Sequence, residues 1–163
     1  MKKLFLIRHA KSSWKHPELS DHDRPLNKRG KHDAELMSET LKARGIKPDI
    51  IVTSSAVRAL EFAKVISDIL NCKKPVISEK LYLASESGLL GIVKETDEKY
   101  NTVFLIGHNP GITYFANLLS GSSIENIPTS GIAEIGFSHC LWKEIQSGSG
   151  ELLSFDYPKK HYL

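Results

Sequence analysis

Short apolar runs and longer amphipathic stretches alternate along most of the chain. Buried strands are predicted at residues 3–7, 49–53 and 102–106, because each is a run of apolar β-formers too short for a helix. Helices are predicted at 28–44 and from residue 56 onward, where apolar positions recur every three or four residues. Alternating strands and helices are typical of a parallel sheet covered by helices.

Weaker patterns continue this alternation. A short strand is predicted at 75–78 and a helix at 85–98. Asn109 is a natural N-cap and Pro110 suits a first helical position, so a further helix is predicted directly after the third strand. Residues 10–27 are polar, without a sustained period, and are predicted to form a long loop.

The last part of the chain has a β-type pattern. Strands are predicted at 132–138, 140–145 and 152–157, and residues 157–163 are interpreted as a solvated tail. These strands are expected to add antiparallel pairs at the edge of the sheet. The pattern therefore predicts an α/β protein, a three-layer α/β/α sandwich with a mostly parallel central sheet, formed by a single domain over residues 1–163.

The composition is that of an ordinary folded protein, with 163 residues, 40% apolar and 25% charged, and a net charge of +3. The basic residues are spread along the chain, so no nucleic acid partner is expected. The apolar run Leu4 to Ile7 is too short for a signal or membrane segment. Cys72 and Cys140 lack metal or disulfide spacing, so a cytoplasmic protein is expected. The sequence indicates no oligomeric state.

Three predicted parallel strands end close to residues that suit phosphate chemistry. Arg8 and His9 follow the first strand, Arg58 lies shortly after the second, and His108 follows the third. The carboxyl ends of parallel strands meet at one edge of an α/β sheet, which is where such sheets bind ligands. We therefore expect these four side chains to converge on one pocket.

The helix starts near this edge indicate that the ligand is an anion. With Ser55 as N-cap, Arg58 is predicted at the third helical position, where the helix dipole disfavours a cation by about 0.3–1 kcal/mol. A bound anion would reverse that effect. The helix predicted to start at Asn109 offers free backbone N–H groups to the same anion. The pattern predicts a phosphate pocket formed by Arg8, Arg58, His108 and Asn109.

Three segments resemble the motifs of the histidine phosphatase superfamily, which includes the cofactor-dependent phosphoglycerate mutases. They are Leu-Ile-Arg-His-Ala-Lys at 6–11, Ser-Ser-Ala-Val-Arg-Ala at 54–59 and Gly-His-Asn-Pro-Gly at 107–111. Within that superfamily, the small size and the segment Asp-Arg-Pro-Leu-Asn at 23–27 resemble the SixA-type phosphohistidine phosphatases. The resemblance spans essentially the whole chain.

The resemblance implies a phosphoglycerate mutase-like fold and catalysis that needs neither a metal nor a cofactor. His9 would be the nucleophile that becomes phosphorylated, Arg8 and Arg58 would clamp phosphate oxygens, and His108 would donate a hydrogen bond to the phosphoryl group. Elementary electrostatics agrees, because the flanking arginines disfavour protonation of His9 and so keep the nucleophile available.

One feature of the mutase-like relatives is missing. They usually carry a catalytic carboxylate shortly after the second arginine, where this chain has Leu81-Tyr82-Leu83. Glu79 or Glu86 could donate a proton from a displaced position, although each is more typical of a solvated surface residue. Without a strong acid an alkoxide leaves poorly, whereas an imidazole, with a pKa of about 6.5, leaves readily. The sequence therefore favours protein phosphohistidine as the substrate.

Other functions stay open at this stage. A small-molecule phosphomonoesterase or a mutase-type phosphotransferase would act on a small phosphorylated substrate, and a catalytically silent module would only bind phosphohistidine. The presence of His9 argues against the silent module, and the missing carboxylate and the short chain argue against the mutase. Asp21, His22 and Asp23 could form a metal cluster but are interpreted as turn and surface residues.

Overall fold

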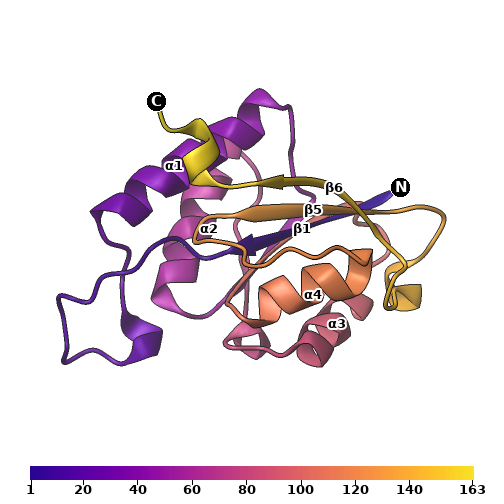
Figure 1. The fold of residues 1–163 in the computed structure, drawn as a ribbon, viewed down its shortest axis with the longest axis horizontal. Helices are drawn as coiled ribbons and strands as arrows, with labels where there is room; N and C mark the ends of the chain where they lie inside the picture. Colours follow the sequence, from indigo (N-terminus) through magenta and orange to yellow (C-terminus); the bar gives the residue numbers. More distant parts are fainter.

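The computed structural model describes residues 1–163 and contains one six-stranded sheet (Figure 1). Its strands are β1 (Lys2–Arg8), β2 (Ile50–Ser54), β3 (Val76–Ser78), β4 (Thr102–Gly107), β5 (Ile132–Phe137) and β6 (Glu151–Asp156). The spatial order is β3-β2-β4-β1-β5-β6. The strands β3, β2, β4 and β1 pair in parallel, whereas β5 pairs antiparallel with β1 and β6 pairs antiparallel with β5. The predicted mostly parallel sheet with an antiparallel edge is confirmed.

Helices cover both faces of this sheet, as Figure 1 shows. They are α1 (Lys28–Ala43), α2 (Val57–Leu70), α3 (Glu86–Lys94) and α4 (Gly111–Ser120). Because side chains alternate along a strand, Phe5 and Ile7 of β1 join the core under α1 and α2, whereas Leu4 and Leu6 join the core under α3 and α4. The three-layer α/β/α prediction is confirmed. No helix combines the length and the apolar character that crossing a bilayer requires.

The register of β1 and β4 sets the position of the two candidate histidines. Arg8 pairs with Gly107 at the carboxyl end of this parallel ladder. The backbone N–H of His9 then donates to the carbonyl of Gly107 at 3.1 Å. His9 and His108, the next residue of each strand, therefore leave the sheet side by side.

Two helix starts differ from the sequence expectation by one residue. α2 begins at Val57 after Ala56, so Arg58 is the second helical residue and Ser55 is not the N-cap. α4 begins at Gly111, yet the Asn109 side chain still accepts from the backbone N–H of Thr113 at 3.3 Å. Both α2 and α4 still begin at the carboxyl edge of the parallel strands. The helix predicted at 85–98 is shorter and ends at Lys94.

Two expectations for the last part of the chain are wrong. Residues 140–145 do not form a strand, because Trp142 is buried in a short 3-10 turn and its indole N–H donates to the carbonyl of Tyr100 at 2.7 Å. The final residues are not a free tail either. They form a 3-10 turn at Pro158–His161, and the Tyr162 hydroxyl donates to Asp33 of α1 at 2.6 Å.

The predicted loop at 10–27 is ordered by contacts with the start of α1. An isolated bridge joins Ser12 to Leu26, and the backbone N–H of Asn27 donates to the carbonyl of Lys11 at 3.0 Å. The Asn27 side chain caps α1 by accepting from the N–H of Gly30 at 2.7 Å. The loop that begins at His9 is thus attached to a helix at its far end.

This attachment depends on the missing side chain of Gly30. A Cβ there would lie 2.0 Å from the Lys11 carbonyl oxygen, whereas a Cβ at Gly91 in α3 would meet nothing within 4 Å. We expect Gly30→Ala to lower the free energy of unfolding by about 1–3 kcal/mol in urea denaturation, because backbone must move. Gly91→Ala is the matched control and should be neutral or raise stability by up to about 1 kcal/mol. Equal effects of the two substitutions would contradict the close approach.

Candidate active site

His9 is a nearly buried histidine whose proton position is fixed by its own backbone. Its Nδ1 lies 2.7 Å from the carbonyl oxygen of Ala10. A carbonyl only accepts hydrogen bonds, so Nδ1 must carry the proton in the neutral ring. The lone pair of His9 is therefore on Nε2, which is the atom available to attack a phosphorus.

His108 lies beside His9, with ring centroids 5.1 Å apart. Its Nδ1 is 3.4 Å from a guanidinium nitrogen of Arg58, which can only donate. Its Nε2 must then carry the proton and donate to the hydroxyl of Ser54 at 2.7 Å. The end of β2 and the start of α2 thus position the His108 ring.

Both rings are held in the neutral form. Burial, and to a smaller extent the positive charges of Arg58 and Arg8, lower the pKa of His9 to about 3. Burial and then Arg58 lower the pKa of His108 to about 4. Near neutral pH the site therefore has two unprotonated imidazoles beside two arginines, and one of these imidazoles has a free Nε2.

The two predicted arginines are anchored by backbone carbonyls. The Arg8 guanidinium donates to the carbonyl of Ile127 at 3.1 Å, and that of Arg58 donates to the carbonyl of Asp21 at 2.6 Å. Arg58 also donates to the Asp21 carboxylate at 3.0 Å. Asp21 lies in an exposed turn, as expected from the sequence, and its carboxylate in addition contacts the site.

Asp21 joins three residues of the pocket. One carboxylate oxygen accepts from Arg24 at 3.1 Å, and the other accepts from Arg58 and from the Tyr82 hydroxyl at 2.6 Å. The hydrogen bond from Tyr82, followed by those from Arg58 and Arg24, keeps the pKa of Asp21 well below its usual range. The same bond raises the pKa of Tyr82. Asp21 is therefore an ionised bridge and no proton donor near neutral pH.

Sequence reasoning assigned no site role to Arg24 or Tyr82. Arg24 follows Asp21 by three residues, a spacing that allows the two to pair in a turn, and this was the signal that could have found it. Tyr82 stands where a carboxylate was expected, and its ring packs edge-on against His108 with centroids 5.4 Å apart. His22 also contacts the segment between β2 and α2, since its Nε2 lies 2.9 Å from the hydroxyl of Ser55.

Four buried polar atoms around this site have no hydrogen-bond partner, namely Nε of Arg8, Arg24 and Arg58, and Oγ of Ser130. Buried polar groups are normally paired, and a tetrahedral oxyanion carries several acceptor oxygens. Arg8, His9 and Arg24 line one cavity of about 430 Å³. The arrangement suits a phosphate-sized anion. No three His, Cys, Asp or Glu side chains are grouped in a way that could hold a metal ion.

The side chains of the other predicted site residues make no hydrogen bond to either histidine side chain. The Asn109 amide donates to Asn126 and to the carbonyl of Ile127, both at 2.9 Å, and so supports the carbonyl that also holds Arg8. Glu79 is exposed and Glu86 is half-buried in the first turn of α3. Neither glutamate side chain makes a hydrogen bond to a site residue, although the Glu79 carbonyl accepts from the backbone N–H of Tyr82 at 3.1 Å.

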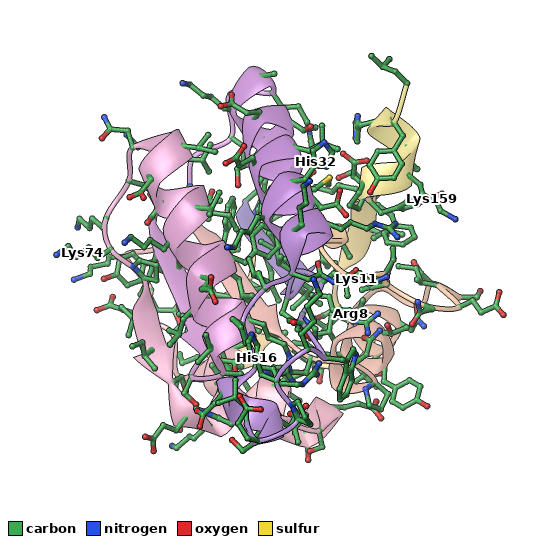
Figure 2. The ribbon with its side chains drawn as sticks, turned by 90° about the vertical axis from the view of Figure 1, so that its left-hand side faces the viewer. Arg8, Lys11, His16, His32, Lys74 and Lys159 are labelled. Atoms are coloured by element: carbon green, nitrogen blue, oxygen red, sulfur yellow. The ribbon has the colours of Figure 1, made fainter.

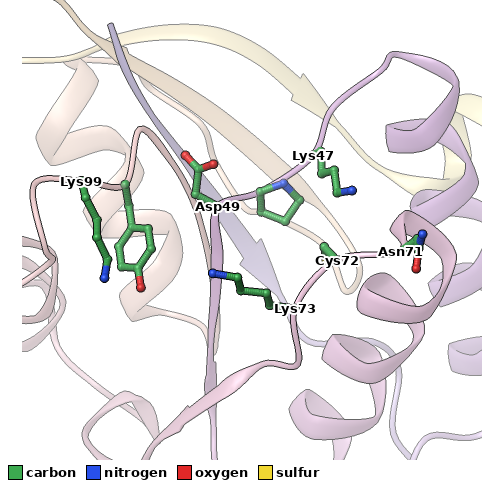
Figure 3. Close-up of a pocket in the computed structure, with 8 residues that line it drawn as sticks. Lys47, Asp49, Asn71, Cys72, Lys73 and Lys99 are labelled. Carbon is green, nitrogen blue, oxygen red and sulfur yellow. The ribbon is translucent and has the colours of Figure 1, made fainter.

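A larger cavity of about 690 Å³ lies at the opposite edge of the sheet, at the amino ends of β2 and β4 (Figure 3). It is lined by Lys47, Asp49, Lys73 and Lys99 among others, and no residue of the predicted site is part of it. It contains no buried atom that lacks a partner. In Figure 2 Arg8 and Lys11 lie together, far from Lys74, which precedes β3. The chemistry of the protein is therefore expected at the carboxyl edge.

Comparison with known proteins identifies a family and a fold. Residues 4–82 match the family model described as "Histidine phosphatase superfamily (branch 1)". An uncharacterised protein of Mycobacterium leprae is 31% identical over 94% of this chain and 100% of its own length. The phosphohistidine phosphatase SixA of Escherichia coli is 28% identical over 81% of this chain and 83% of its own length.

Solved structures agree with these relatives. A SixA-type protein of Agrobacterium tumefaciens is 26% identical with a TM-score of 0.84, covering 96% of this chain and 98% of its own. The protein histidine phosphatase SixA bound to tungstate gives a TM-score of 0.85 at 22% identity, covering 98% and 99%. A mycobacterial glucosyl-3-phosphoglycerate phosphatase has the same fold, with a TM-score of 0.73 at 13% identity over 96% of this chain and 100% of its own.

The neutral state of His9 predicts a pH dependence of stability. The unfolded chain takes up a proton at each histidine near pH 6.5, whereas folded His9 stays neutral down to about pH 3. The free energy of unfolding therefore falls as the pH drops from about 6.5 to 4, by about 1.4 kcal/mol per pH unit for each such histidine. Urea unfolding between pH 4.5 and 6 gives the change of the free energy of unfolding with pH. This change per pH unit should be smaller in His9→Gln than in the wild type by about that amount. An unchanged slope would show that folded His9 titrates normally.

The position of Arg58 predicts a loss of anion affinity. We expect Arg58→Ala to weaken the binding of inorganic phosphate about tenfold or more, because a charged hydrogen bond contributes about 1.5–3 kcal/mol. Titration calorimetry measures this directly. Arg44→Ala is the control, since Arg44 pairs with Glu134 away from the pocket at 2.7 Å. Equal phosphate affinity in the two variants would exclude Arg58 as an anion ligand.

Proposed function

The chain belongs to the histidine phosphatase superfamily and its SixA-type branch, and on that basis we propose that it hydrolyses phosphohistidine on proteins through an intermediate phosphorylated on His9. The family makes the chain a phosphatase. The finer statement, which concerns the substrate and the residue roles, is supported most by one observation. The only carboxylate bound within the site, Asp21, is ionised and bound by Arg58 and Tyr82, so no carboxylic acid is placed there to protonate an alkoxide.

The first chemical step uses the free lone pair of His9. Nε2 attacks the phosphorus of the substrate, the P–N bond to the substrate imidazole breaks, and its electron pair returns to the leaving ring, which takes up one proton and departs as neutral imidazole. Because Nδ1 of His9 donates to the Ala10 carbonyl, the positive charge that develops on the ring is stabilised by that oxygen. Water then attacks phosphorylated His9, which releases inorganic phosphate and restores the neutral ring.

The arginines support both steps by electrostatics. The three Nε–H groups of Arg8, Arg24 and Arg58 are buried without partners, and we expect these guanidinium groups to donate to phosphoryl oxygens. Positioned charged donors stabilise the transition state of phosphoryl transfer because charge spreads over the equatorial oxygens. Tungstate, an oxyanion of similar shape, is bound by the structurally similar SixA, which supports the same use of the pocket here.

His108 can donate the expected hydrogen bond to the phosphoryl group only after a change of protonation state. Its neutral tautomer donates through Nε2 to Ser54, and Nδ1 accepts from Arg58. A hydrogen bond from His108 to the phosphoryl group therefore needs a second proton, at Nδ1. A phosphoryl dianion favours that proton by charge attraction. In this proposal His108 is neutral in the free enzyme and protonated in the substrate complex.

The nature of the leaving group separates phosphohistidine from phosphate esters. The Tyr82 hydroxyl is committed to Asp21, and neither Glu79 nor Glu86 contacts the catalytic histidines. An alkoxide needs a proton in the transition state, whereas an imidazole ring, with a pKa of about 6.5, can carry that proton on its other nitrogen near neutral pH and leaves as neutral imidazole. A small-molecule phosphomonoesterase, the activity named for the mycobacterial neighbour, is the alternative.

The test is a comparison of three substrates in the presence of EDTA. A protein carrying phosphohistidine, free phosphohistidine and a simple alkyl phosphate are compared by phosphate release. We expect hydrolysis of both phosphohistidine substrates at least about a hundredfold faster than the ester, with His9→Ala abolishing turnover because the nucleophile is lost. His16→Ala is the control, because His16 is exposed and pairs only with Glu18.

Each result has a clear meaning. Substantial phosphate release by His9→Ala would remove His9 as the nucleophile. Faster turnover of the ester would show that the site has a proton donor and that the physiological substrate is a small phosphorylated metabolite.

A further inference from the structure

Trp14 is an exposed aromatic residue in the wall of the active site. Its side chain is 78% exposed, and single exposed apolar residues are common enough to mean little alone. Trp14 differs from the others because it lines the same cavity of about 430 Å³ as Arg8 and His9. Neither the proposed chemistry of His9 nor the phosphate clamp uses it.

One face of the indole is fixed by Arg24. The guanidinium carbon lies 3.6 Å from the ring centroid, which is a close cation–π contact. Arg24 is itself buried and immobilised, because it donates to the Ser12 hydroxyl at 2.7 Å and to Asp21 at 3.1 Å. Its Nε has no partner. The indole thus rests on a rigid support that also belongs to the phosphate pocket.

We propose that Trp14, supported by Arg24, is the subsite for the imidazole ring that leaves from the phosphohistidine substrate. This inference rests on the proposed function, since it concerns the leaving group of that reaction. In an in-line transfer the leaving nitrogen lies on the side of the phosphorus opposite Nε2 of His9, so the substrate ring extends outward from the pocket. A planar ring there has the exposed indole as its stacking surface.

The leaving ring regains the electron pair of the P–N bond and takes up one proton, so it departs as neutral imidazole. A neutral aromatic ring stacks on the indole by dispersion, and this contact holds the leaving ring in line with the bond that breaks. Loss of such positioning lowers the rate as well as the affinity. Trp14 is therefore a specificity residue for aromatic nitrogen leaving groups.

The experiment compares two small phosphorus–nitrogen substrates that differ only in the leaving ring. N-phosphoimidazole releases imidazole, whereas phosphoramidate releases ammonia and has no ring to stack. We expect Trp14→Ala to lower kcat/KM for N-phosphoimidazole about threefold to tenfold and to leave phosphoramidate hydrolysis unchanged, with Trp14→Phe recovering most of the loss. The control is Tyr114→Ala, an exposed aromatic on α4 without contact to Arg24.

The possible results separate this inference from the function on which it rests. If the wild-type protein hydrolyses N-phosphoimidazole and Trp14→Ala does so equally fast, the subsite is refuted and the proposed function stands. Equal losses for both substrates, or a weaker binding of inorganic phosphate, would mean that Trp14 only shapes the phosphate pocket. A loss confined to phosphohistidine on a protein would assign Trp14 to protein docking instead. His9-independent or absent turnover in the wild type would refute both proposals.

Discussion

The site depends on holding three arginines beside two neutral histidines, although like charges repel and burial penalises each of them. Asp21 makes this arrangement possible, because its single carboxylate binds both Arg24 and Arg58 and is kept ionised by them and by Tyr82. Backbone carbonyls of Ile127 and Asp21 supply the remaining anchors. The charges are therefore in place before any substrate arrives, which is what transition-state stabilisation by electrostatics requires.

Much of the fold could be predicted because buried strands and amphipathic helices leave strong local patterns. The runs at residues 3–7 and 102–106 became neighbouring parallel strands, and their shared register brought His9 and His108 together. Local patterns are weaker at element ends, so the starts of α2 and α4 were displaced by one residue. The strand predicted at 140–145 is wrong because Trp142, an aromatic suited to a strand, fills the core from a turn.

The part of the site that sequence reasoning missed is the part made by long-range contacts. Asp21 reaches Arg58 and Tyr82 across 37 and 61 positions of the chain, and nothing in the local pattern of residues 10–27 encodes such pairings. Arg8, His9 and His108 were predicted because each lies at a strand end, and Arg58 because it lies at the start of the helix after β2, and the topology brings these segments to one edge. Asp21 and Arg24, which support them, lie in a loop whose path depends on tertiary structure.

The hydrogen bond between His9 and the Ala10 carbonyl also determines the regiochemistry of the intermediate. This bond occupies Nδ1, the ring nitrogen nearer to the backbone. The proposed enzyme phosphate can therefore form only on Nε2, the outer ring nitrogen. The covalent species would therefore be the τ isomer of phosphohistidine, with its ring orientation unchanged between attack and hydrolysis. Two consecutive residues of the chain, without help from any distant side chain, suffice to select one of two isomeric products.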